Sequence, residues 1–150
     1  MSKQQTSQSS FGIYSLYALG AIACFVFFQF FYPYHLFYQE QNQLFLSSWD
    51  YLTTYLDKPG WLACLAGDFL TQFYYFRYAG PIILTLCILI TGHNVKCAVR
   101  DADIQGKKTA DIVAFIMMIL LVCFSFHYDY RLCSILAIAG GASVFRVSTK

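Results

Sequence analysis

Long apolar runs separated by short polar segments dominate the pattern of this chain. The first run covers residues 13–32 and lies in a stretch between Lys3 and Glu40 that contains no Asp, Glu, Lys or Arg. An α-helix rises about 1.5 Å per residue, so a run of this length can cross the ~30 Å hydrocarbon core of a bilayer. The pattern therefore predicts a transmembrane helix close to the N-terminus.

Three later apolar runs predict further spans. They cover residues 81–95, 112–126 and 132–145. Pro81 suits the first turn of a helix, where its missing N–H has no intrahelical partner. Residues 96–108 are predicted to form a polar loop, and Asp111 suits the helix N-terminus that follows it. The last run is short for a full crossing, although flanking Arg131 and Arg146 could extend their charged ends to the membrane surface.

The N-terminal segment allows two interpretations. Residues 1–10 are polar and low in complexity, which predicts disorder, and residues 11–150 then form a single membrane domain. A cleaved signal peptide is the alternative, with Ala21-Ile22-Ala23 as its cleavage site, and the same stretch followed by Cys24 resembles a lipoprotein box. Because the apolar run continues directly after this bond, an uncleaved span is favoured.

Composition supports a membrane protein. The chain is 58% hydrophobic and 12% charged, whereas soluble domains contain about 25% charged residues. Aromatic residues make up 19% of the chain, and many lie near the expected membrane boundaries, where Tyr and Trp are favoured. The net charge of +2 and the lack of a basic run argue against binding to nucleic acid.

The six cysteines show no metal-binding spacing, and neither a metal nor a cofactor is predicted. Cys24, Cys87 and Cys123 lie within apolar runs, where a thiol acts as a small hydrophobe. Only Cys64 and Cys133 could share the extracytoplasmic side and form a bridge. The sequence leaves open whether these two cysteines pair.

Lys and Arg positions predict the orientation, because cytoplasmic loops carry an excess of positive charge. A cytoplasmic N-terminus places most of them on the cytoplasmic side, namely Lys3, Lys96, Arg100, Lys107, Lys108, Arg146 and Lys150. The other side then holds Lys58, Arg77 and Arg131. The loop formed by residues 33–80 is therefore expected outside the cell, and the termini and residues 96–110 inside.

Two interfacial helices are predicted in the 33–80 loop. Between residues 44 and 56 a helical stripe is formed by Phe45, Trp49, Leu52 and Leu56. Such a helix would lie flat on the membrane with its aromatic side chains buried. A second helix is expected over 61–76, where small residues four positions apart, Ala63 and Gly67, suit close helix packing.

The same loop holds the candidate catalytic residues, which are the carboxylates Glu40, Asp50 and Asp68. A carboxylate at the membrane edge can act as a general base or bind a cation. Each also has a structural interpretation, as a helix cap, a solvated charge or a paired buried group. Asp68 is the most costly to bury unpaired, and Gln72 or Arg77 are its expected structural partners.

Part of the chain resembles an uncharacterised family of polytopic membrane proteins from Bacteroidota. The landmarks are Tyr38-Gln39-Glu40-Gln41 with Leu44-Phe45, then Lys58-Pro59-Gly60, then Gly67-Asp68-Phe69-Leu70-Thr71-Gln72-Phe73. The similarity covers most of residues 14–135 and assigns no chemistry. It implies longer relatives with more spans, so this chain looks like a truncated or split member whose missing helices come from a partner or a further C-terminal part.

The layout is also similar to membrane-embedded glycosyltransferases that use lipid-phosphate sugars. Those enzymes place an acidic residue just outside the first span, which would match Glu40 first and Asp50 second. This is an analogy of architecture, which is weak evidence for activity. Part of such an enzyme is therefore kept only as an alternative function.

These observations predict an all-α, multi-pass protein of the bacterial cytoplasmic membrane, with three to four transmembrane helices and a cytoplasmic N-terminus. The expected partner is the lipid bilayer, and the chain alone is expected to be inactive. A small transporter subunit is a further alternative, although the spans carry no central charge to mark an ion path. The substrate and oligomeric state stay open.

Overall fold

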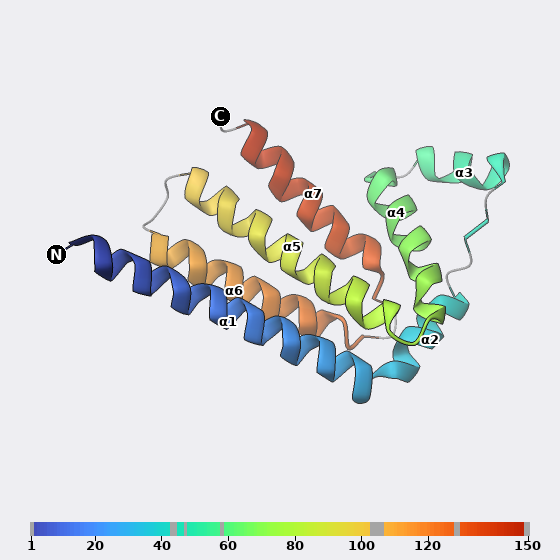
Figure 1. The fold of residues 1–150 in the computed structure, drawn as a ribbon. Helices are drawn as coiled ribbons and strands as arrows, with labels where there is room; N and C mark the ends of the chain where they lie inside the picture. The colour runs from blue at the N-terminus through green and yellow to red at the C-terminus, as the bar shows by residue number, and fades with distance from the viewer. Residues whose placement is uncertain are drawn as a thin grey trace.

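The computed structural model describes residues 2–42, 45–46, 48–57, 59–102, 107–127 and 130–148. Within these ranges the chain forms seven α-helices, one short 3-10 helix and no strand (Figure 1). The elements are α1 (Ser2–Phe30), α2 (Pro33–Asn42), α3 (Trp49–Leu56), α4 (Trp61–Thr71), η1 (Gln72–Tyr75), α5 (Ala79–Asp101), α6 (Lys107–Phe124) and α7 (Leu132–Ser148). The predicted all-α fold is confirmed.

The four long helices α1, α5, α6 and α7 form a bundle in which α5 packs against each of the other three. The start of α1, the end of α5, the start of α6 and the end of α7 lie at one end of this bundle, which we call the termini end (Figure 1). The shorter helices α2, α3 and α4 lie at the opposite end, which we call the α2–α4 end. There α4 packs against α7, and α2 packs against η1.

A sharp break separates α1 from α2. The axes of residues 17–30 and 33–41 differ by 72° across this break. Pro33 begins the second helix because its ring lacks an N–H and cannot continue the hydrogen-bond ladder of the first. Helix α2 was not predicted from the sequence, and it places Glu40 in the last turn of a helix.

Two polar segments are helical where the pattern predicted none. The first helix begins at Ser2, within the segment expected to be disordered. The fifth helix continues to Asp101, through residues that were expected to form a loop. There Lys96 forms an ion pair with Asp111 at 2.5 Å, and Cys97 is buried, so the polar stretch has tertiary partners that support a helix.

The predicted 44–56 helix is shorter than expected. It begins at Trp49 because Ser48 adopts an extended backbone and its Oγ accepts a hydrogen bond from the Tyr51 N–H at 3.4 Å. Leu44 lies outside the described residues. Trp49 is 76% exposed, whereas Phe45 contacts Phe69 of α4, so the expected stripe lies partly on the surface and partly against α4. Tyr55, outside the stripe, is the buried side chain of the helix.

By length and composition, α5 can cross a membrane, and the bent pair 17–30 and 33–41 would supply a second span. This statement covers only the part of the chain that the structure describes. The apolar helices Thr109–Phe124 and Leu132–Ser148 are shorter. The expectation of three to four spans therefore stays a prediction.

Candidate functional site

The three candidate carboxylates occupy different environments. Glu40 is half-buried on α2, and Asp50 is exposed in the first turn of α3, where a negative charge favours the helix N-terminus. Asp68 is only 8% exposed and lies inside the contact between α4 and its neighbours. Of the three, Asp68 alone combines burial with a described hydrogen bond from a neighbouring helix.

A short hydrogen bond from α3 satisfies the buried carboxylate. The hydroxyl of Tyr55 donates to Asp68 Oδ2 at 2.5 Å, and the Tyr51 hydroxyl lies 2.6 Å from that of Tyr55. Since the only hydroxyl proton of Tyr55 goes to Asp68, Tyr51 is the donor in the second contact. Burial raises the pKa of Tyr55, and the hydrogen bond to Asp68 raises it further. Tyr55 therefore stays protonated and joins α3 to α4.

The expected partners of Asp68 serve other contacts. Gln72 Nε2 donates to the backbone carbonyl of Phe45 at 2.9 Å, which fixes the segment before α3. The ring of Phe45 also contacts the ring of Phe69 at a centroid distance of 5.7 Å. Arg77 is exposed, and its guanidinium lies 5.9 Å from the ring centre of Tyr78. Tyr55 was not predicted as the partner of Asp68, because the residue at which α3 begins decides which way the Tyr55 side chain faces.

Beside Asp68, the backbones of α4 and α7 approach closely. A Cβ placed on Gly67 would lie 2.6 Å from the backbone nitrogen of Cys133 and 2.9 Å from its Cα. Only a residue without a side chain fits this contact, as the small-residue spacing in α4 predicted. Cys64 lies one turn before Gly67 and so lies on the face of α4 that packs against α7 near Cys133. Both cysteines are free and half-buried.

A second buried polar cluster lies where α2 meets the connection between α6 and α7. Gln39 Nε2 donates to the backbone carbonyl of Tyr130 at 2.7 Å and lies 3.2 Å from His35 Nε2. Burial lowers the pKa of His35, although the nearby backbone of Ser125 and His127 opposes the shift. This cluster was not predicted from the sequence. The spacing of His35 and Gln39 by four positions was its signal, but that signal needed α2 to be recognised.

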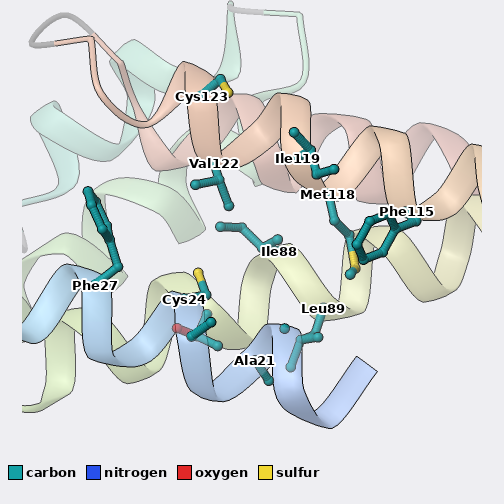
Figure 2. Close-up of a pocket in the computed structure, with 13 residues that line it drawn as sticks. Ala21, Cys24, Phe27, Ile88, Leu89, Phe115, Met118, Ile119, Val122 and Cys123 are labelled. Carbon is teal, nitrogen blue, oxygen red and sulfur yellow. The ribbon is translucent and has the colours of Figure 1, made fainter. Parts of the chain in front are cut away.

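An apolar cavity of about 350 Å³ lies between α1, α5 and α6 (Figure 2). Its walls include Cys24 and Phe27 from α1, Ile88 from α5, and Phe115 and Met118 from α6. The hydroxyl of Thr85 is the one polar side-chain group among the lining residues other than the thiols. Such walls can accommodate hydrocarbon but provide little to orient a polar substrate.

Acid–base catalysis needs groups that converge on one reacting centre. Here the polar groups of the α2–α4 end make contacts that hold helices together, namely Tyr55 with Asp68, Gln72 with Phe45 and Gln39 with Tyr130. Among the described residues, no group of three or more His, Cys, Asp or Glu side chains is placed to hold a metal ion. The arrangement is therefore best explained as a set of packing contacts.

Comparison with known proteins gives a family but no activity. Searches of curated proteins and of solved structures found no significant match. One protein family, described as a family of unknown function (DUF6057), matches residues 8–150. The match covers nearly the whole chain and agrees with the expected resemblance to an uncharacterised family. The chain therefore belongs to the family of unknown function DUF6057.

Proposed function

We propose that the chain is an integral membrane protein of the bacterial cytoplasmic membrane. In this proposal α1, α5, α6 and α7 cross the bilayer, and the α2–α4 end lies on the extracytoplasmic side. The protein has a structural role within the membrane, is not an enzyme by itself, and associates with further transmembrane helices.

The outer surface of the bundle carries this proposal. Each helix exposes large apolar side chains, and on α1 and α5 they recur every three or four positions along one face. They are Leu19, Ile22, Val26 and Phe30 on α1, Ile82, Leu86 and Ile90 on α5, Ile112, Ile116, Ile119 and Phe124 on α6, and Ile138, Val144 and Phe145 on α7. Leu19 is 68% exposed and Phe30 is 73% exposed. Water-soluble monomers rarely expose contiguous apolar surface on this scale, whereas lipid chains cover it without cost.

The distribution of charge supports the orientation. At the termini end, Lys96 pairs with Asp111 and Arg146 with Asp101. Arg100 is exposed in the last turn of α5 at the same end. Positive residues beside the ends of membrane helices favour the cytoplasmic side.

Extraction and thiol labelling test the proposal. Thr54 and Arg100 are exposed at opposite ends of the molecule, and each would be changed to Cys in a background whose six cysteines are replaced by Ser or Ala. We expect the chain to stay in membranes at alkaline pH. We also expect a membrane-impermeant maleimide to label Thr54→Cys in spheroplasts, but Arg100→Cys only after lysis.

Two results would contradict the proposal in different ways. Release of the wild-type chain by alkaline carbonate would reject membrane integration. Labelling of Arg100→Cys but not Thr54→Cys in intact spheroplasts would reverse the orientation. The cysteine-free chain, treated with the same maleimide, gives the labelling background.

A further inference from the structure

We propose that Cys64 and Cys133 form a reversible disulfide that joins α4 to the start of α7. This inference rests on the proposed function, because it requires the α2–α4 end to face the oxidising side of the membrane. The pair would be a redox-controlled covalent link between the α2–α4 end and the bundle.

The packing of α4 on α7 places the two thiols together. Gly67 brings its helix so close that an added Cβ would lie 3.0 Å from the Cβ of Cys133. Cys64 precedes Gly67 by three positions and so lies on the same face of α4. Cys64 is therefore a neighbour of Cys133 across the contact between α4 and α7, which is the arrangement that a disulfide between the two helices needs.

The other cysteines lack this arrangement. Cys87 and Cys97 are buried, and Cys97 Sγ lies 3.6 Å from His93 Nε2. Cys24 and Cys123 line the apolar cavity. Cys64 and Cys133 are half-buried, so a reagent or an oxidoreductase can reach them. In the proposed orientation they also lie in the compartment where disulfides persist.

The bond would form by thiol–disulfide exchange with a disulfide-carrying oxidoreductase. One cysteine attacks the carrier disulfide as the thiolate, which forms a mixed disulfide and releases one carrier thiol. The second cysteine then attacks the sulfur bound to the first and displaces the other carrier thiol. The two cysteines lose two electrons and two protons, and both carrier sulfurs become thiols. A reduced dithiol carrier reverses the reaction.

The link would change how firmly the two parts of the molecule are held together. Residues 64 and 133 enclose η1, α5 and α6, so the covalent ring contains the centre of the bundle. A disulfide that closes a long loop restricts the unfolded chain strongly. In the oxidised protein the contact at Gly67 is therefore permanent, whereas in the reduced protein α4 can separate from α7.

Thiol counting in cells tests the inference. Cells expressing the full chain are quenched in acid, and the denatured protein is treated with a maleimide polymer that adds a fixed mass to each free thiol. The chain has six cysteines, so a single disulfide predicts four labels, and six labels after prior reduction. Cys64→Ser should give five labels with or without reduction. The control variant Cys123→Ser should give three labels, and five after reduction.

Six labels in the unreduced wild-type protein would overturn the inference, provided that Thr54→Cys is labelled from outside. If Thr54→Cys proves to be cytoplasmic, the proposed orientation fails, and the pair is then tested in purified protein. There, diamide should remove two free thiols from the wild type and none from Cys133→Ser. Retention of all six thiols in diamide would overturn the proximity of the pair itself.

Discussion

The two ends of the bundle hold their helices together in different ways. At the termini end the links are charged pairs, with Lys96 Nζ 2.5 Å from Asp111 Oδ1 and Arg146 Nε 2.8 Å from Asp101 Oδ2. At the α2–α4 end they are hydrogen bonds between neutral groups, apart from the carboxyl group of Asp68. Gln39 binds the carbonyl of Tyr130 at 2.7 Å, and Tyr55 binds Asp68 at 2.5 Å.

Solvent access explains this difference. The charged side chains at the termini end keep 14–34% of their surface exposed, so each pair keeps some contact with solvent. His35, Gln39, Tyr55 and Asp68 at the other end are each less than 9% exposed. A buried polar group without a partner costs about 1–3 kcal/mol, so each of these residues requires its partner. The α2–α4 end should therefore be the more sensitive of the two to substitution.

The largest effect is expected from Gly67→Leu. Its side chain would meet the backbone of Cys133, which cannot move aside without displacing α7, so we expect a loss of about 3 kcal/mol in the free energy of unfolding. The matched control is Gly141→Leu, because a Cβ at Gly141 has no neighbouring atom within 4 Å. Denaturant unfolding in detergent measures both variants. Equal stabilities of the two would contradict the close packing of α4 on α7.

Tyr55→Phe should have the next largest effect. It removes the hydroxyl that donates to Asp68 and leaves the carboxylate buried without that donor, at a cost of about 2 kcal/mol. Tyr34→Phe is the control, because Tyr34 is 87% exposed. The same unfolding assay compares the two variants. If Tyr55→Phe were as stable as Tyr34→Phe, the hydrogen bond to Asp68 would contribute nothing.

A pH titration should give a smaller effect at the same end. Burial lowers the pKa of His35, so the folded protein binds a proton less readily than the unfolded chain. Stability should therefore be complete above the ordinary histidine pKa of about 6.5 and should fall as the pH drops below it. His35→Gln should flatten this decline, whereas replacement of the exposed His127 by Gln should not. Parallel curves for wild type and His35→Gln would reject a role for His35.

Predictability from the sequence differed between the two ends for a physical reason. The bundle helices follow from long apolar runs, because helix formation needs only local sequence and an apolar face. The buried pairs join residues far apart in the chain, such as Gln39 with Tyr130, and no local pattern specifies them. Tyr55 was missed because Ser48 starts α3 later than the apolar stripe suggested. Asp68 was recognised because a lone carboxylate in an apolar helix is conspicuous.

The smallest effect should come from the termini end. Asp111→Asn removes the partner of Lys96, which also lies 5.3 Å from the ring centre of Tyr17, and the expected loss of unfolding free energy is about 1 kcal/mol. Because the side chains of Lys96 and Asp111 are 18% and 14% exposed, 0.5 M salt should weaken the wild-type pair and reduce the difference between variant and wild type. The loss caused by Tyr55→Phe should not change with salt, since its hydrogen bond is buried. Equal salt dependence of the two variants would show that the ends do not differ in solvent access, and the contrast between charged and neutral links would lose its physical basis.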